Sequence, residues 1–263
     1  TEPDVRRALD DILGLTRKPI FALEPNAISE IDQLPDESLE RYLTYRYRYV
    51  VWPDQKILGD YPPCFQIEPT SICNYRCIFC YQVDKSFSAK KSPHMRTMNF
   101  DLCKSAVDEI EGHVEAINIA SRGEPLVSPI LPQILEYLRG KFLAVKVNTN
   151  ASLLDEKKSH MLLEAELQTL VFSADAADSP LYEQLRIGGN LNTVFRNIER
   201  FQEIKQKHYP KSRTITRVSG VYLNEKQKFD KMKSFWGGLV DHVSFTGYKP
   251  WKDGNQAPLN GIN

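Results

Sequence analysis

The sequence predicts an α/β fold in which short strands alternate with amphipathic helices. Six apolar or β-rich segments recur along the chain, and segments with helical spacing of apolar residues separate them. The spacings suit right-handed crossovers between parallel strands. Polar motifs follow the first four strands at their carboxyl ends, which is the edge where ligand sites of parallel α/β barrels lie.

Length and charge narrow the class of function. The chain has 263 residues, enough for one large domain or two small ones. Lysine plus arginine and aspartate plus glutamate number 34 each, so nothing indicates nucleic acid or a membrane surface as a partner. No apolar run approaches the roughly 18 residues of a membrane span. Five cysteines, an odd number, fit a reducing compartment, and we expect a cytoplasmic protein.

Residues 1–60 precede the strands and form a predicted helical extension, and residues 61–263 form the predicted main domain. Residues 4–13 carry apolar side chains at helical spacing, and Ser38 can cap another helix. Residues 41–52 are rich in arginine and tyrosine, a composition that also suits stacking on a nucleic-acid strand. Because the overall charge is balanced, we favour aromatic packing on the main domain, with the arginines in water.

The elements of the main domain follow in regular order. Strands are predicted over 64–68, 116–120, 142–147, 167–173, 213–223 and 240–246. Helices are predicted over 99–112, 129–139, 153–163, 192–207 and 225–236. Asn99 is the predicted N-cap of the first of these helices. Cys103 lies on its apolar stripe, so we interpret Cys103 as a core residue, and Cys64 in the first strand likewise as a small buried side chain.

Three cysteines stand close together directly after the first strand. Cys73, Cys77 and Cys80 have the spacing C-x3-C-x2-C in a loop. Thiolates at this spacing suit an iron–sulfur cube, because each can hold a different iron. A structural zinc site is an alternative, although it prefers four ligands and the sequence has no second C-x2-C unit. A disulfide is another alternative, but three cysteines leave one unpaired.

The cysteine motif resembles the signature of the radical S-adenosylmethionine (SAM) superfamily, in which an aromatic residue precedes the last cysteine, as Phe79 does here. The resemblance implies that the three cysteines hold a [4Fe–4S] cluster and that SAM fills the open fourth iron. It also implies that Phe79 packs near the cluster and the adenine. It selects a partial (β/α)6 barrel, which periodicity alone does not distinguish from a doubly wound sheet.

Two further motifs resemble SAM-binding motifs of the same superfamily. Gly123, Glu124 and Pro125 resemble the end of a Gly-Gly-Glu-Pro motif, with Arg122 in place of the first glycine. The resemblance implies that backbone carbonyls and Glu124 hold the SAM amino group, since an ammonium needs acceptors. Asn150 lies in a turn similar to Thr-Asn-Gly and is a further candidate to bind SAM.

The later strands add more candidates. Ser173 resembles the serine of a Ser-Ile-Asp motif that reaches the ribose or carboxylate of SAM. Arg186 resembles an arginine that pairs with the SAM carboxylate, because a planar guanidinium matches a carboxylate. A surface salt bridge is the alternative role for Arg186. Val218 and Val221 are candidates to face the adenine.

The resemblance implies reductive cleavage of SAM to a 5′-deoxyadenosyl radical, followed by hydrogen abstraction from a substrate. An external electron donor, flavodoxin-like or ferredoxin-like, is then expected. We expect a small sugar-like or aminocyclitol-like substrate that is oxidised or epimerised, because residues 1–60 show no leader-peptide-binding pattern. A maturase of ribosomal peptides is the alternative. A non-catalytic iron–sulfur or zinc scaffold is the alternative from another class, although a scaffold needs no SAM anchors. The sequence identifies no catalytic acid or base.

The last residues suggest a continuation. Residues 249–254 resemble the run-in to a C-terminal cysteine-rich domain, SPASM or twitch, which binds auxiliary clusters in many relatives. No cysteine follows Cys103, so this chain itself cannot ligate such a cluster. Either the protein is a short member that has no such domain, or a SPASM or twitch domain lies beyond residue 263, and we expect the second.

Overall fold

The computed structural model describes residues 3–249, and its main element is a six-stranded parallel sheet. The strands are β1 Phe65–Ile67, β3 Ala116–Ile119, β4 Ala144–Thr149, β5 Thr169–Ser173, β7 Ile215–Tyr222 and β8 His242–Gly247. They pair in the order β1-β3-β4-β5-β7-β8, so each neighbour in space is the next of these six in sequence. This is the partial (β/α)6 barrel expected from the sequence, and all six predicted strands are confirmed.

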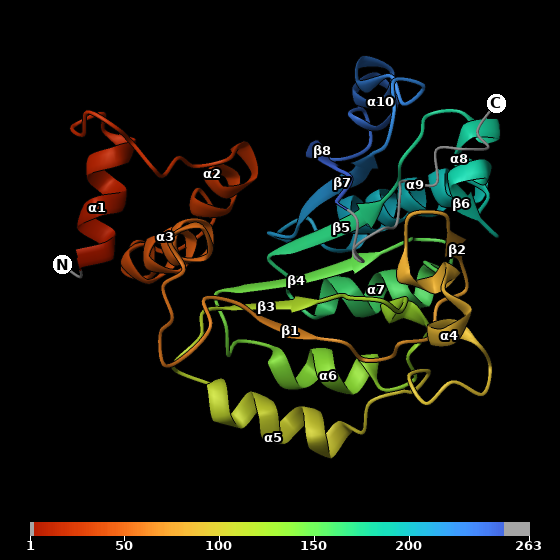
Figure 1. Cartoon of the computed structure of the whole chain (residues 1–263), viewed down its shortest axis with the longest axis horizontal. Helices are drawn as coiled ribbons and strands as arrows, with labels where there is room; N and C mark the ends of the chain where they lie inside the picture. The colour runs from red at the N-terminus through yellow and green to blue at the C-terminus, as the bar shows by residue number, and fades with distance from the viewer. Residues whose placement is uncertain (1–2, 250–263) are drawn as a thin grey trace.

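Helices cover the outer face of this sheet. They are α5 Phe100–Ile110, α6 Leu131–Leu138, α7 Glu156–Glu164, α9 Leu191–His208 and α10 Phe229–Trp236. Figure 1 shows α5, α6 and α7 side by side along one side of the sheet. The five predicted helices are confirmed. Asn99 caps α5 as expected, since its side chain accepts a hydrogen bond from the Asp101 backbone N–H. Cys103 is 2% exposed in the apolar core, which confirms its assignment.

Alternation along the strands separates an apolar outer face from a polar inner face. On β4, Val145 and Val147 are buried in the core that the helices cover, while Lys146 points to the other face. On β7, Val218 is fully buried in the same core and Arg217 lies on the inner face. The barrel interior is therefore lined by side chains that can bind polar ligands.

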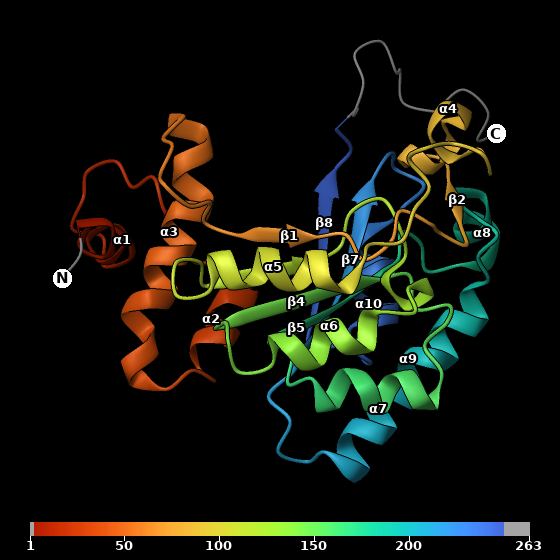
Figure 2. The ribbon, with the colours of Figure 1, turned by 90° about the horizontal axis from the view of Figure 1, so that it is seen from below.

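The extension consists of α1 Pro3–Ile12, α2 Pro25–Ile31 and α3 Leu39–Gln55. Figures 1 and 2 both place these helices at the end of the sheet where the strands begin. Tyr42 and Tyr45 of α3 pack against Ala116 and Ala144, which confirms the expected aromatic packing. Arg46, however, is only 8% exposed, so the expectation that the arginines lie in water is wrong for this side chain.

Several short elements were not predicted. They are β2 Arg76–Cys77, β6 Arg186–Ile187, α4 Lys85–Ser88, α8 Ser179–Leu185 and the 3₁₀ turns η1 Asp36–Ser38, η2 Tyr81–Val83 and η3 Pro125–Val127. Strands of two residues are too short to show a hydrophobic period. The pair β2–β6 is antiparallel and sets Cys77 opposite Arg186. It therefore joins the cysteine loop to a segment more than a hundred residues away in sequence.

The helices and strands do not test two expectations, the domain boundary at residue 60 and the C-terminal run-in. The division of the chain at residue 60 stays a prediction. The SPASM-like or twitch-like run-in over 249–254 lies outside the described residues, apart from Lys249. Within the described range, no helix combines the length and the apolarity that crossing a membrane requires.

Candidate active site

One cavity at the carboxyl ends of the strands brings the sequence-predicted residues together. It is lined by Cys73, Cys77, Phe79, Cys80, Gly123, Glu124, Asn150, Ser173 and Arg186. Of the residues in the Gly-Glu-Pro motif, Pro125 does not line it. Pro125 is buried instead at the start of η3, directly behind Glu124. Loops from four strands converge here, because the loops that follow parallel strands all lie at the carboxyl end of the barrel.

The three cysteine thiols are suited to a metal cluster. All five cysteines of the chain are free, so the disulfide alternative is wrong. Burial raises the pKa of Cys73 to about 11 and that of Cys77 to about 12. Thiols in this state need bound metal cations to become thiolates, because metal binding displaces the proton.

The zinc alternative lacks a complete ligand set. Among residues 3–249, no three His, Cys, Asp or Glu side chains converge on one ion position. A structural zinc ion needs four converging ligands. The three thiols line one cavity, and three thiolates are the donor set of an iron–sulfur cube with one open iron, so the residues present fit such a cluster.

The Gly-Glu-Pro turn packs tightly against the cysteine loop. A Cβ atom on Gly123 would lie 1.8 Å from the carbonyl oxygen of Thr70, so this position requires glycine. Glu124 is 3% exposed, and its carboxylate accepts three hydrogen bonds, from the backbone N–H of Leu126 (3.0 Å), the Thr149 hydroxyl (2.6 Å) and the backbone N–H of Asn150 (2.7 Å). A carboxylate has about four acceptor positions, so one remains for a ligand.

The charge of Glu124 also favours a cationic ligand. Burial raises the pKa of this carboxyl group, although its three hydrogen bonds act in the opposite direction. An ammonium group at the remaining acceptor position would stabilise the carboxylate. Glu124 therefore has two roles. It offers an acceptor to a cationic ligand, and it also fixes the turn that follows β4 through Thr149 and Asn150.

That turn confirms the resemblance to Thr-Asn-Gly at the level of the backbone. Ala151 has a φ of 58°, which is the left-handed conformation that glycine adopts without strain. Asn150 is buried, and its side-chain amide donates to the Asn74 side chain in the cysteine loop at 2.9 Å. The turn and the loop are thus held in one arrangement by polar side chains.

Arg186 has a partner that sequence reasoning missed. Its Nε lies 2.5 Å from Oδ2 of Asp175, and both side chains are buried. Burial alone would lower the pKa of Arg186, but the Asp175 carboxylate reverses this effect and raises it. Arg186 therefore does form a salt bridge, but the salt bridge is buried and not on the surface as the alternative proposed. Pairing of Arg186 with the SAM carboxylate stays a prediction.

Arg186 also faces the cysteine loop. Its Nη1 lies 3.8 Å from the sulfur of Cys77, and its guanidinium lies 5.8 Å from the centre of the Phe79 ring. A fixed cation beside a thiol favours the thiolate form that a metal ligand needs. Asp175 follows Ser173 by two residues, so the Ser-Ala-Asp sequence contained the signal for this ion pair.

The remaining candidates differ in their position. Ser173 lines the cavity, and its hydroxyl has no hydrogen-bond partner within the described part of the chain. Val221 also lines the cavity, as expected for a residue that faces the adenine. Val218 does not, because its side chain is fully buried in the core on the outer face of the sheet. The expectation for Val218 is therefore wrong, and it fails because residues an odd number apart on a strand face opposite sides.

Gln82 was not predicted from the sequence. Its side chain is 1% exposed, and its amide donates to the carbonyl oxygens of Ser71 and Arg122, both at 2.8 Å. Arg122 in turn pairs with Glu68 at the end of β1 (2.8 Å). These contacts fix the cysteine loop against the Gly-Glu-Pro turn. A glutamine near a motif carries no recognisable pattern, so no signal in one sequence identifies it.

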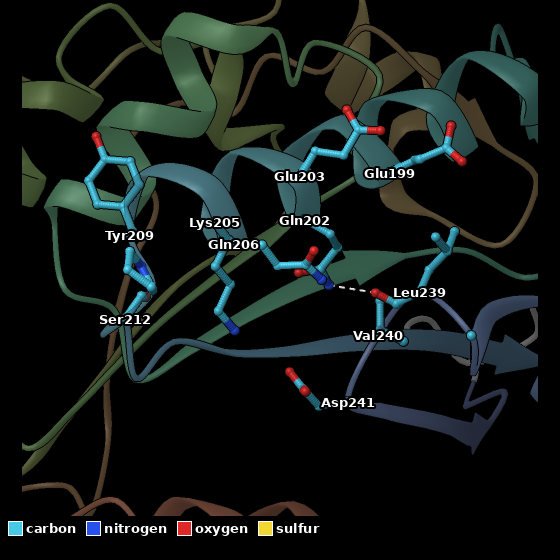
Figure 3. A pocket seen from close by; sticks show the side chains of 12 residues that line it. Glu199, Gln202, Glu203, Lys205, Gln206, Tyr209, Ser212, Leu239, Val240 and Asp241 are labelled. Carbon is cyan, nitrogen blue, oxygen red and sulfur yellow. Dashed lines mark hydrogen bonds between the residues drawn. The ribbon is translucent and has the colours of Figure 1, made fainter.

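A different hollow lies on the outside, between α9 and the start of β8 (Figure 3). Two of its polar side chains join α9 to the segments that precede β7 and β8. Gln202 donates to the carbonyl oxygen of Leu239 (2.5 Å), and Lys205 donates to that of Thr214 (2.6 Å). The hollow has no thiol and lies away from the carboxyl ends of the strands. We therefore assign it a structural role and not a catalytic one.

Comparisons with known proteins agree with this cavity. A probable GTP 3′,8-cyclase of Methanococcus maripaludis is 30% identical over 142 residues, which are 53% of this chain and 46% of that protein. The mycofactocin maturase MftC of Mycolicibacterium smegmatis is 28% identical over 141 residues, which are 53% of this chain and 34% of that protein. The chain thus spans less than half the length of these relatives.

A solved structure shows the same fold. Streptococcus suis SuiB, bound to its precursor peptide SuiA, superposes with a TM-score of 0.59 at 20% identity, over 80% of this chain and 44% of that one. Residues 67–232, which include the three clustered cysteines, match the sequence profile of the Radical SAM superfamily. The chain therefore belongs to the radical SAM superfamily, whose members use a [4Fe–4S] cluster and SAM.

Proposed function

We propose that Cys73, Cys77 and Cys80 hold the [4Fe–4S] cluster and that the adjoining cavity binds SAM. The observation that carries this proposal is that one cavity is lined both by the three thiols and by Glu124 and Arg186 from separate strand ends. When bound, the cluster would supply the electron, and SAM the hydrogen-abstracting group, for the radical chemistry. A flavodoxin-like or ferredoxin-like donor would deliver the electron.

The residues of the chain bind and orient. Glu124 offers its remaining acceptor position to the SAM ammonium, with Gly123 allowing the backbone to approach closely. Ser173 offers a hydroxyl to the ribose or the carboxylate. Arg186, held by Asp175, presents its other N–H groups to an anionic group. Phe79 packs beside this guanidinium and shields the cluster side of the cavity from water.

We propose a small, hydroxyl-rich substrate, sugar-like or aminocyclitol-like, that is oxidised or epimerised. Support comes from the inner face of the barrel next to the SAM cavity, where amide and hydroxyl side chains replace the usual branched apolar ones. Asn148, Ser173 and Ser219 line the SAM cavity from three neighbouring strands. Such side chains donate and accept hydrogen bonds, as sugar hydroxyl groups require.

Maturation of a ribosomal peptide is a second candidate, which the similarity to MftC favours. The two candidates predict different ligands. Binding of a precursor peptide at micromolar affinity to the holo-protein would support the maturase and count against the small-molecule proposal.

Anaerobic reconstitution with iron and sulfide tests the shared part of the proposal. We expect about four irons per chain and formation of 5′-deoxyadenosine from SAM under a strong reductant. Glu124→Gln is expected to weaken SAM binding while leaving the iron content unchanged. One equivalent of zinc together with no 5′-deoxyadenosine would contradict the proposal and favour a scaffold. Iron without SAM binding would also favour a non-catalytic scaffold.

A further inference from the structure

A second cavity, here called the basal cavity, lies inside the barrel at the end where the strands begin. It measures about 250 Å³, which is room for more than a few waters. The strands contribute Asn118, Lys146, Thr169 and Arg217, and the extension contributes Glu30 and Arg46. The helices α2 and α3 therefore close the barrel interior from the side opposite the SAM cavity (Figure 2).

Positive side chains outnumber negative ones in the basal cavity. Lys146 comes from β4 and Arg217 from β7, with β5 between them, and Arg46 comes from α3. Within the described residues, the Nε atoms of Arg46 and Arg217 are buried without a hydrogen-bond partner. Lys146 likewise has no ion-pair partner among the described residues. Arg46 pairs with Glu24 and stacks on the rings of Tyr45 and Tyr49, so Lys146 and Arg217 are the two cations of this cavity that lack an ion pair within the described residues.

The nearby carboxylates do not balance these cations. Glu30 is buried and already accepts hydrogen bonds from the hydroxyl groups of Tyr42 (2.5 Å) and Thr169 (2.9 Å). The Glu24 side chain is 66% exposed and lies 3.9 Å from Arg46. Two carboxylates, of which only Glu30 is buried, therefore face three cationic side chains.

This excess of positive charge opposes folding in the absence of a ligand. Burial lowers the pKa of Lys146, and the neighbouring Arg217 lowers it further. Burial also lowers the pKa of Arg217. A buried cation without a counter-charge is costly unless a ligand supplies one. A bound anion would supply that charge and would use the free guanidinium donors.

The basal cavity adjoins the SAM cavity. Thr246 of β8 lines both. Lys146 and Asn148 are two residues apart on β4, as Arg217 and Ser219 are on β7, and each pair faces the same side of the sheet. Asn148 and Ser219 line the SAM cavity, so a ligand that contacts Lys146 and Arg217 extends toward the SAM cavity through the barrel interior.

We propose that the substrate carries an anionic group, a carboxylate or a phosphate, which Lys146 and Arg217 bind at the base of the barrel. This rests on the proposed function, because it assigns the substrate of the same active site. It narrows the substrate class, since an aminocyclitol is a cation at neutral pH and these side chains would repel it. A sugar-like molecule with a phosphate or carboxylate group satisfies both the hydroxyl-lined and the cationic part of the interior.

Anion binding to the full 263-residue chain tests this without turnover. The probes are inorganic phosphate and acetate, with potassium chloride at equal ionic strength as the reference and methylammonium as the cation. We expect phosphate or acetate to raise Tm by about 2–4 °C above the chloride reference. A response to phosphate assigns a phosphate group and a response to acetate assigns a carboxylate. Equal Tm values in all four salts would overturn the inference.

Variants locate the bound anion. Lys146→Met and Arg217→Met are expected to weaken anion binding at least tenfold, whereas Lys207→Met on the exposed end of α9 leaves it unchanged. Lys146→Met is also expected to unfold at a higher temperature than the unmodified chain when no anion is present, because it removes a partly buried positive charge that has no ion-pair partner among the described residues. Retained binding in both basal variants would overturn the assignment.

The two proposals fail separately. If the reconstituted protein forms 5′-deoxyadenosine but phosphate and acetate do not change its Tm, only the substrate assignment is wrong. If anions bind at the basal cavity but no 5′-deoxyadenosine forms, only the proposed SAM cleavage is wrong.

Discussion

The two ends of the barrel interior treat buried charge in opposite ways. At the carboxyl end, Arg186 is paired with Asp175 at 2.5 Å, and Glu124 accepts three hydrogen bonds from the chain itself. At the amino end, Lys146 and Arg217 face a cavity that also holds Glu24 and Glu30, but neither cation forms an ion pair with them within the described residues. The carboxyl end is therefore a preorganised site whose ligands add to a finished network. The amino end is complete only with a ligand that brings its own negative charge.

The largest expected effect lies at the carboxyl end, in Cys77→Ser. Serine is a poor iron ligand, so we expect the iron content of the reconstituted chain to fall from about four per chain to near zero. 5′-Deoxyadenosine formation should become undetectable. Iron analysis and chromatography of the reaction products measure both.

The matched control for Cys77→Ser is Cys103→Ala. Cys103 is equally buried but belongs to the apolar core beneath α5. We expect this variant to retain its iron and to lose only about 1 kcal/mol of stability. Loss of iron in both variants would mean that the three-cysteine assignment is incomplete.

A smaller effect, on stability, is expected for Asp175→Asn. This change leaves the buried Arg186 without its carboxylate, and we expect it to lower the free energy of unfolding by about 3–5 kcal/mol. Glu111→Gln breaks the exposed ion pair with Lys141 and should cost about 0–1 kcal/mol. Denaturant unfolding of the two variants compares them directly. Similar losses would contradict the view that the carboxyl end is held together by its own buried charges.

The amino end depends on the carboxylate that it does have. Glu30→Gln should lower the free energy of unfolding by about 1–3 kcal/mol, because Tyr42 and Thr169 would lose a charged acceptor and the three cations would lose their buried counter-charge. The same denaturant measurement applies. If saturating phosphate removes most of this loss, the basal cavity accepts an external anion in place of Glu30. An unchanged loss in phosphate would argue against a ligand there.

The carboxyl end was more predictable from sequence than the amino end. Cys73, Cys77 and Cys80 lie within eight residues, and Gly123, Glu124 and Ser173 follow strands whose apolar runs are recognisable, so local patterns placed nearly all of this site. The partner of Arg186 was harder to predict, because one sequence shows Asp175 next to Ser173 but does not show that Arg186 approaches it in the folded chain.

The amino end gave no comparable signal. In the sequence, Lys146 and Arg217 occupy alternating positions of predicted strands and carry no motif. Arg46 was expected in water but is buried. Only the sheet register and the packing of α3 bring these residues to one cavity. Charges that meet through tertiary structure leave no trace in sequence spacing, which explains why this cavity was missed.

The smallest expected effect is a pH dependence of stability caused by Lys146. Burial, together with Arg217, lowers the pKa of this ammonium group below its ordinary 10.5. Between the lowered value and 10.5 the unfolded chain binds more protons than the folded chain, so stability increases with pH in that window. The unmodified chain should therefore gain stability relative to Lys146→Met as the pH rises from neutrality toward 10.5.

The other groups around Lys146 shape the design of this measurement. Arg46, Arg217 and Glu30 face the same cavity, and burial raises the pKa of the nearby Cys64 thiol, which is a second titratable group beside Lys146. Unfolding curves are therefore compared in a Cys64→Ala background, with and without Lys146→Met. A difference between them that stays constant from pH 7 to about 10 would show that Lys146 titrates as in water. Lys146 would then be solvated by water and would not need a bound anion. The proposed difference in buried charge between the two ends of the barrel would disappear.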